Sequence, residues 1–270
     1  MTVLTARLEV TAWGIAGSVV DLGVVGRGWL GAPRGGAVDP GALRLGNRLV
    51  GSDEAAAGLE TSGGLEVRVL APVTMVCTGA VAEVAVTGGP PMGWGSPVTL
   101  PAGAVVRVVR VVDGLRSYLA IRGGVSAGGS LLGVGPEPSA RPSLAAAVPQ
   151  PRRTTARIWP GPRLDLFDAS AWHALTSAPF TVSSASRVGV RLEGPRLERR
   201  MPVTLASEGL VEGAVQVPPD GLPIVMLADP PTTGGYPVAA VVDRGDLEVL
   251  AQAAPGSSVR FVDATARPKG

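Results

Sequence analysis

Cysteine and histidine are almost absent from this 270-residue sequence, which contains one of each, Cys77 and His173. A single cysteine excludes an internal disulfide and a zinc site built from several cysteines. A single histidine excludes a metal site with two histidine ligands, and a histidine-dependent catalytic triad would have to use His173 itself. We expect Cys77, which lies in an apolar stretch, to be a buried structural thiol. His173 is expected at the surface or near a helix cap.

The sequence also lacks an apolar run long enough to cross a membrane. Its longest stretch without a charged residue, from Val84 to Val106, contains four prolines and cannot form a spanning helix. Arg7 and Glu9 precede any long apolar run, so no signal peptide is visible. We therefore expect a cytoplasmic protein.

Concentrated basic charge and aromatic residues are missing as well. The net charge is +2, the arginines are scattered along the chain, and aromatic residues make up only 4% of it. Proteins that bind nucleic acids usually cluster their cations and offer aromatic rings for stacking. No nucleic-acid partner is therefore expected.

Glycine and proline are abundant, with 38 and 25 residues. At this frequency they would interrupt nearly every helix of a bundle. The apolar content of 46% is nevertheless enough to bury a core, which excludes a disordered chain. Short β-branched runs, such as residues 104–112 (AVVRVVRVV), alternate with glycine- and proline-rich turns. This pattern predicts a mainly β protein of the sandwich or barrel type.

Helix is predicted only in short pieces, over residues 40–50, 53–59, 168–175 and 246–251. The first piece begins at Pro40, a residue favoured in the first helical turn, and Asp39 stands directly before it. An aspartate side chain can accept hydrogen bonds from the free backbone N–H groups at a helix start. We therefore expect Asp39 to cap this helix.

An internal sequence repeat divides the chain into two halves. The pattern Pro-Val-Thr followed by Gly and Val occurs at residues 72–81 and again at residues 202–211, with five identical positions in ten. Two weaker matches flank it in the same order, and chance similarity between valine- and glycine-rich segments is the alternative. We predict two related β-domains, at residues 1–132 and 158–270, joined by a proline-rich connection at residues 133–157.

The second half contains the most specific candidate for a ligand-binding loop, the segment DPPTTGGYP at residues 229–237. Gly234 and Gly235 would let backbone N–H groups converge on an anion. Thr232, Thr233 and Tyr236 add hydroxyl groups, so all five residues are candidates for ligand contact. The structural alternative is a glycine-rich turn capped by a threonine, with Tyr236 packed in the core.

Three polar residues outside this loop are further candidates. Glu208 is a candidate general base, although a solvated acid at a strand end is the simpler interpretation. Gln216 lies in an otherwise apolar strand, where its amide needs either a ligand or a structural partner. Arg34, in a glycine-rich stretch before the first predicted helix, is a candidate for holding a carboxylate or phosphate.

Motifs for binding nucleotides and carrying biotin are absent. The sequence has no P-loop of the form GxxxxGK[ST], and no GxGxxG follows a predicted strand. ATP chemistry would therefore need a different kind of site or another subunit. The sequence also lacks the Met-Lys pair on which biotin is carried, and it offers no metal site.

A further set of motifs spans nearly the whole chain. In the second half they are Arg191-Leu192-Glu193-Gly194, Ser207-Glu208-Gly209, Gly221-Leu222-Pro223-Ile224-Val225 and residues 232–237. In the first half they are Gly35-Gly36-Ala37-Val38-Asp39, Asn47-Arg48-Leu49-Val50-Gly51 and Tyr118-Leu119-Ala120-Ile121-Arg122-Gly123-Gly124. These motifs resemble the KipA family, also called allophanate hydrolase subunit 2 or the biotin-dependent carboxyltransferase family, which includes one of the subunits of 5-oxoprolinase. The chain departs from the family pattern within residues 133–157.

The resemblance implies a fold of two cyclophilin-like β-barrel domains, in agreement with the duplicated β pattern. It also implies a component, active only in a complex, of an ATP-dependent 5-oxoprolinase that opens 5-oxoproline to glutamate. The implied partners are the KipI-like subunit of 5-oxoprolinase and a LamB/YcsF-like subunit, with ATP bound in the assembled complex.

Within this hypothesis we assign catalysis to Glu208 and Tyr236. Substrate binding is assigned to Arg34, Gln216, Thr232, Thr233, Gly234 and Gly235. Two alternatives stay open: a non-catalytic KipA-type regulator that binds a KipI-like kinase inhibitor, and a carboxyltransferase module of the urea carboxylase type.

Overall fold

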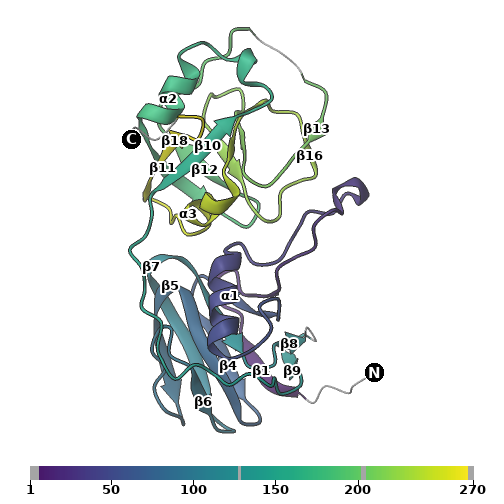
Figure 1. Cartoon of the computed structure of the whole chain (residues 1–270), viewed down its shortest axis with the longest axis vertical. Helices are drawn as coiled ribbons and strands as arrows, with labels where there is room; N and C mark the ends of the chain where they lie inside the picture. The colour runs from purple at the N-terminus through teal and green to yellow at the C-terminus, as the bar shows by residue number, and fades with distance from the viewer. Residues whose placement is uncertain (1–5, 127–128, 202–204, 267–270) are drawn as a thin grey trace. The chain divides into compact units, whose positions relative to one another are not determined.

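The computed structural model of the chain describes residues 6–126, 129–201 and 205–266 (Figure 1). Contacts within the chain divide it into two compact units. Unit 1 comprises the residues up to Gly23 together with Asp39–Pro151, and unit 2 comprises Val24–Val38 together with the residues from Arg152 onward. Residues 202–204, which carry part of the pattern repeated between the two halves, lie outside the described residues.

Unit 1 is built on a sheet of nine antiparallel strands. Their order is β2-β3-β7-β4-β1-β9-β8, and β5 pairs with β7 and with β6. The strands are β1 (Ala6–Ala12), β2 (Ser18–Val20), β3 (Gly58–Thr61), β4 (Leu65–Val69), β5 (Val73–Thr87), β6 (Val98–Leu100), β7 (Val105–Ile121), β8 (Val125–Ser126) and β9 (Leu131–Val134). One α-helix, α1 (Pro40–Leu49), packs on β5 and β7.

The long strands β5 and β7 pair along most of their length. Valine recurs along both strands, which suits a pleated, half-buried surface. The ladder between them bulges between Gly79 and Val81, where Gly79 has a φ of 79°. Cys77 of β5 is fully buried, and this burial raises the pKa of its thiol to about 12. The predicted burial of Cys77 is confirmed.

Helix α1 begins as the sequence predicts. The Asp39 side chain accepts a hydrogen bond from Ala42 N at 3.0 Å, and Pro40 occupies the first helical position. The backbone N–H of Asp39 donates to the Tyr118 hydroxyl at 2.8 Å. This hydroxyl in turn donates to Oε2 of the buried Glu60 at 2.6 Å, so a buried polar chain ties the helix start to the sheet.

Residues 53–59 do not form the predicted helix. Asp53 Oδ1 accepts a hydrogen bond from Ala55 N at 2.8 Å, and its carbonyl accepts one from Ala56 N at 3.0 Å, which closes a turn. Gly58 then begins β3, where a Cβ atom would lie 2.8 Å from the carbonyl oxygen of Leu119. Asp53 is therefore a turn residue and not a helix start, because the chain after it pairs within the sheet.

The first part of the proline-rich segment after β9 is packed on unit 1. Arg122, which is 8% exposed, donates from Nη2 to the carbonyl of Pro138 at 2.7 Å and pairs with Glu137. Further along, Ala147 N donates to the carbonyl of Gly95 at 3.0 Å. This stretch of the segment predicted as a connection is therefore anchored by hydrogen bonds.

Unit 2 is a closed barrel with the strand order β10-β17-β14-β15-β12-β11-β18. The barrel strands are β10 (Thr155–Pro160), β11 (Pro179–Ala185), β12 (Gly189–Glu193), β14 (Ala214–Gln216), β15 (Ile224–Met226), β17 (Val238–Val242) and β18 (Ser258–Asp263). A separate ribbon consists of β13 (Glu208–Gly209) and β16 (Thr233–Gly234). The helices are α2 (Ala171–Ser177), α3 (Leu247–Ala251) and the 3-10 helices η2 (Leu164–Leu166) and η3 (Arg244–Asp246).

The barrel encloses its own apolar core. Phe180 and Phe261 meet there with ring centroids 5.9 Å apart. Helices α2 and α3 lie close to the predicted segments, and His173 is exposed on α2. The predicted mainly β fold with two barrel-like sheets and a few short helices is confirmed.

Residues Val24–Val38, called the arm below, belong to unit 2 although they interrupt unit 1 in the sequence. The loop closes where Val24 N donates to the carbonyl of Arg34 at 2.8 Å, and the 3-10 helix η1 (Gly28–Leu30) lies within it. At its far end Val38 is buried in the barrel core. The two predicted domains are contiguous segments of the chain, so they do not place the arm in the second half.

Two hydrogen bonds hold the arm between these points. Gly35 N donates to the carbonyl of Ala228 at 3.1 Å. Arg187 Nη2 donates to the carbonyl of Gly36 at 2.6 Å, while the same guanidinium pairs with Asp229. The arm is thus attached to the barrel through its backbone.

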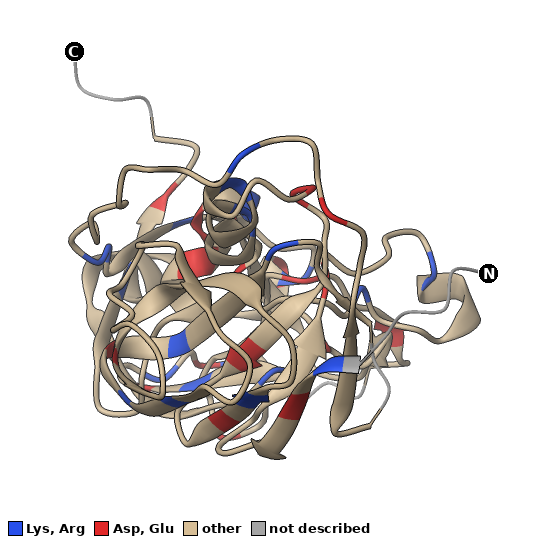
Figure 2. Ribbon diagram, turned by 90° about the horizontal axis from the view of Figure 1, so that it is seen from below, with Lys and Arg blue, Asp and Glu red and all other residues tan. Residues whose placement is uncertain are grey.

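Charged residues of both signs are interspersed along the ribbon (Figure 2). Some pair across neighbouring strands of unit 1, as Arg68 does with Glu9 at 2.9 Å and Arg110 with Glu83 at 2.9 Å. Within the described ranges, no helix has the length and apolar character needed to span a bilayer.

Candidate functional site

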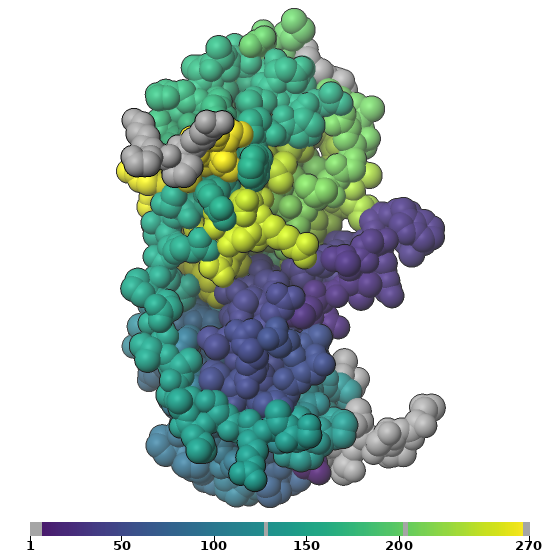
Figure 3. All heavy atoms as spheres, in the orientation of Figure 1, coloured from purple at the N-terminus to yellow at the C-terminus, as the bar shows by residue number. Residues whose placement is uncertain are grey.

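A cavity of about 550 Å³ lies between the arm and the barrel of unit 2. The arm, whose tip projects as the purple segment in Figure 3, contributes residues 24–28 and 32–34. The barrel side contributes Trp159, residues 210–212, Thr232, residues 241–244 and Leu247. The volume is typical of sites for small molecules. We take this cavity as the candidate site.

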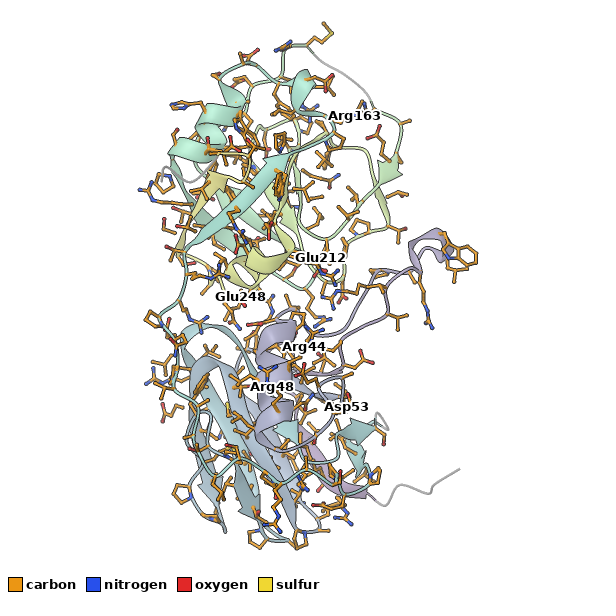
Figure 4. All side chains as sticks on the ribbon, viewed as in Figure 1. Arg44, Arg48, Asp53, Arg163, Glu212 and Glu248 are labelled. Atoms are coloured by element: carbon orange, nitrogen blue, oxygen red, sulfur yellow. The ribbon has the colours of Figure 1, made fainter. Side chains whose placement is uncertain are left out.

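Arg34 joins the arm to the barrel side of the cavity through Glu212, which is labelled in Figure 4. Arg34 Nε lies 3.0 Å from Glu212 Oε2, and Nη2 lies 2.8 Å from Oε1, a bidentate pair. The two side chains are only 11% and 20% exposed. Arg34, predicted to hold a ligand anion, therefore lines the cavity but is engaged by a carboxylate of its own chain.

A network of ion pairs fixes the cavity wall at η3. Asp246, which is 2% exposed, accepts hydrogen bonds from Arg157 Nε and from Arg153 Nη1, both at 2.7 Å. Burial alone would raise the pKa of Asp246, but the hydrogen bonds from both arginines outweigh it and lower the pKa to about 2. Asp243 accepts from Arg157 Nη2 at 3.1 Å and from Trp159 Nε1 at 3.2 Å. The indole of Trp159 is thereby held at the cavity.

Two other arginines of the cavity have no such partner. Arg27 of the arm and Arg244 of η3 are exposed, and neither side chain makes a hydrogen bond or ion pair with a described residue. Together with Arg34, Glu212 and Asp243, they give the lining three positive and two negative formal charges. The cavity is therefore slightly cationic.

Metal ligands are not gathered anywhere in the described parts of the chain. No three His, Cys, Asp or Glu side chains come together there in an arrangement that could hold a metal ion. The chemistry of the cavity thus rests on guanidinium, carboxylate and hydroxyl groups and on its apolar wall.

Glu208 lies on β13, outside the cavity lining, and pairs with Arg163, which is labelled in Figure 4. Arg163 Nε donates to Oε2 at 3.1 Å, and a second contact joins Nη2 to Oε1. The hydrogen bond from Arg163 lowers the pKa of Glu208 below its ordinary value. The carboxylate is held ionised and is a weaker base than a free glutamate.

Gln216 has a structural partner. Its side chain is 4% exposed, and Nε2 donates to the carbonyl of Tyr236 at 3.1 Å. A Cβ atom on Gly234 would lie 2.6 Å from that nitrogen, whereas one on Gly235 would come no closer than 3.8 Å to Leu205 O. Neither glycine has a positive φ. Close packing on Gln216, rather than a left-handed turn, therefore explains the glycine at 234.

Tyr236 is not a core residue. It is 47% exposed, and its hydroxyl has no hydrogen-bond partner among the residues that the structure describes. The phenol therefore remains available to a ligand or to a partner protein.

The predicted site residues fall into two groups. Arg34 and Thr232 line the cavity. The others lie in or beside the ribbon of β13 and β16, namely Glu208, Gln216, Thr233, Gly234, Gly235 and Tyr236.

The cavity also contains residues that were not predicted from the sequence, namely Arg27, Trp159, Glu212 and Arg244. Arg27 shares a glycine-rich stretch with Arg34, and this neighbourhood was a usable signal. Glu212 has no motif that would have identified it.

Comparison with known families and proteins gives consistent matches. The family model "Carboxyltransferase domain, subdomain A and B" matches residues 30–133 and 127–263. A protein of Escherichia coli (strain K12) named as a subunit of 5-oxoprolinase is 34% identical, over 94% of this chain and 90% of its own length. The Haemophilus influenzae protein of the same name is 30% identical, over 90% and 87%. Urea amidolyase of Saccharomyces cerevisiae is 26% identical over 94% of this chain, but over 16% of its own length.

Solved structures share the fold. The crystal structure of TTHA0988 superposes with a TM-score of 0.85 at 33% identity, over 96% of this chain and 56% of that one, so this chain spans little more than half of it. Kluyveromyces lactis urea carboxylase gives a TM-score of 0.87 at 22% identity, over 97% of this chain and 28% of its own. At that identity the likeness concerns the fold alone.

Proposed function

The chain belongs to the family of carboxyltransferase domains, subdomains A and B, and on this premise we propose that it is one component of an ATP-dependent 5-oxoprolinase. In that enzyme it acts with the KipI-like subunit of 5-oxoprolinase and a LamB/YcsF-like subunit. The assembled complex opens 5-oxoproline to glutamate.

The observation that carries this proposal is the extent of the match. Identities of 34% and 30% extend over 90% and 87% of two proteins that are named as the same 5-oxoprolinase subunit. The match to urea amidolyase covers 16% of that much longer protein. The match over most of these two named subunits is what supports assigning the chain to the same complex.

The chemistry explains the need for ATP. A five-membered lactam resists direct attack by water, whereas phosphorylation of its carbonyl oxygen makes the carbon electrophilic. Water then adds to this carbon, and the C–N bond breaks as the nitrogen takes a proton, which leaves the acyl phosphate of glutamate. A second water hydrolyses the acyl phosphate, so the products are glutamate, ADP and phosphate. No nucleotide motif assigns ATP to this chain, so we place it in the complex.

The site residues contribute binding and proton transfer in this scheme. The cavity with Arg34, Glu212 and Thr232 holds the substrate. Glu208, held ionised by Arg163, can accept a proton from water, and the exposed Tyr236 hydroxyl can donate one.

A carboxyltransferase of the urea carboxylase type is the second candidate, favoured by the family model and by the urea amidolyase matches. It would require carboxybiotin on another chain or domain. Here the carboxyl group would pass from biotin to an amide nitrogen.

Co-expression with the two companion subunits tests the proposal. We expect 5-oxoproline to stimulate ADP release from ATP, with glutamate formed in equal amount. A stoichiometric complex that releases no ADP with 5-oxoproline, but consumes carboxybiotin when urea is added, would establish the second candidate instead. Tyr236→Phe and Glu208→Gln in the same complex test the site assignment, and full activity in both would remove these residues from the mechanism.

A further inference from the structure

We propose that Arg27 and Arg244 bind the carboxylate of a small organic monoanion in the cavity, with Trp159 forming part of the apolar wall against which the ligand packs. The identification of this monoanion as 5-oxoproline rests on the proposed function. The binding of a monocarboxylate to these two arginines does not depend on it.

The first argument is that these guanidinium groups make no hydrogen bond or ion pair with a described residue. The other arginine in the cavity, Arg34, makes a bidentate pair with Glu212. Three arginines elsewhere in unit 2 are engaged as well: Arg153 and Arg157 pair with Asp246, and Arg163 pairs with Glu208. Arg27 and Arg244 have no such partner in the described structure, although both line the cavity. Carboxylates and phosphates are the partners whose geometry matches a guanidinium group.

The second argument is the charge balance, which selects among anions. The lining carries Arg27, Arg34 and Arg244 against Glu212 and Asp243, a formal excess of one positive charge. One carboxylate neutralises this excess. A triphosphate would bring several negative charges next to two fixed carboxylates, and like charges at close range repel. The cavity therefore suits a monoanion and disfavours ATP.

The third argument is the apolar wall. Trp159 is 46% exposed, and its Nε1 is held by Asp243 Oδ2 at 3.2 Å, so the ring is fixed without being buried by its own chain. Leu210, Val211 and Val241 also line the cavity. A compact ring with apolar methylene groups and one carboxylate satisfies both the cationic and the apolar parts of the lining.

The test is direct binding by the full chain, measured by isothermal titration calorimetry. The probes are 5-oxoproline, 2-pyrrolidinone (the same ring without the carboxylate), inorganic phosphate and ATP. We expect binding of 5-oxoproline, and at least tenfold weaker binding of the other three. Loss of one charged hydrogen-bond donor typically costs roughly tenfold in affinity, so Arg27→Gln and Arg244→Gln should each weaken 5-oxoproline binding by about that factor.

Arg191→Gln is the matched control. Arg191 is an exposed arginine on β12 that is not part of the cavity lining, so its replacement should leave affinity unchanged. Equal affinity for 2-pyrrolidinone, tighter binding of phosphate or ATP at these arginines, or no effect of either cavity variant would overturn the proposal. So would an absence of 5-oxoproline binding.

The result of this binding test can be distinguished from the result of the activity test of the proposed function. A complex without 5-oxoprolinase activity whose chain still binds a monocarboxylate through Arg27 and Arg244 would refute the proposed function alone. An active complex in which both cavity variants keep the wild-type KM for 5-oxoproline would refute the binding site alone.

Discussion

The hydroxyl of Tyr118 donates a 2.6 Å hydrogen bond to Oε2 of Glu60, with both side chains fully enclosed in unit 1. Burial raises the pKa of Tyr118 well above its ordinary value, and the nearby charge of Glu60 raises it further. The phenol therefore stays protonated and serves as a permanent donor. The same oxygen accepts the N–H of Asp39, the residue that caps α1.

Replacing this tyrosine is expected to destabilise unit 1. Tyr118→Phe removes both hydrogen bonds and leaves the Asp39 N–H without the hydroxyl that accepts it. The expected loss is about 1–3 kcal/mol in the free energy of unfolding, measured by urea denaturation. Tyr236→Phe is the matched control, because the Tyr236 hydroxyl is exposed and has no partner in the described structure. Equal stability of Tyr118→Phe and wild type would contradict the interpretation.

The buried carboxylate of Asp246 should make stability depend on acidity. Its folded-state pKa of about 2 lies below the ordinary value of 3.8 that it regains on unfolding. The stabilisation is therefore fully present above about pH 4 and is lost as the pH falls toward 2. Its arginine partners are half exposed, and solvent screening reduces the contribution to about 1–2 kcal/mol.

The measurement compares Asp246→Asn with wild type in urea at pH 7 and at pH 3. The variant is expected to be less stable at pH 7, and the difference should shrink at pH 3 as the wild-type carboxylate loses its advantage. A difference that stays constant between the two pH values would show that the charge of Asp246 contributes nothing.

The pairing of Glu208 with Arg163 predicts a shift in the pH profile of the assembled enzyme. If Glu208 acts as a base, activity falls as the pH drops through its lowered pKa. Arg163→Gln removes the hydrogen bond that lowers this pKa, so the acidic limb of the kcat/KM profile should move to higher pH. Carboxyl carbon shifts of Glu208 followed by NMR check the same change directly. An unmoved acidic limb together with a moved NMR titration would exclude Glu208 as the base.

Local sequence signals were enough to predict much of the fold. The β-branched run at residues 104–112 lies in β7, and Asp39 caps α1, because each depends on neighbours within a few residues. The helix expected at residues 53–59 does not form, because Gly58 approaches the backbone of Leu119, which lies on a strand distant in sequence. Local propensity does not report such tertiary contacts.

The candidate site was predicted less completely for the same reason. Arg34 was identified, but its partner Glu212 is 178 residues away, and no local pattern indicates that pairing. Gly234 was identified as a glycine that opens backbone N–H groups to a ligand. The structure adds that a Cβ atom at this position would lie 2.6 Å from the Gln216 amide nitrogen, a contact between segments that no local pattern predicts. Sequence pattern therefore identified individual residues such as Arg34 and Gly234, but not the distant side chains that pack against them.

The ion pair between Arg34 and Glu212 should control how firmly the arm is held. Both side chains are mostly buried, so Arg34→Gln removes a strong charge-assisted contact and leaves the Glu212 carboxylate without its bidentate partner. The arm should then open more often, while the core of the barrel stays folded. Arg27 is an exposed trypsin site on this arm, so limited trypsinolysis reports the opening.

We expect cleavage after Arg27 to become several-fold faster in Arg34→Gln and in Glu212→Gln. Glu9→Gln, which breaks an exposed ion pair of unit 1, should leave that rate unchanged. Wild-type cleavage rates in both arm variants would mean that backbone contacts alone, such as Gly35 N to the carbonyl of Ala228, hold the arm.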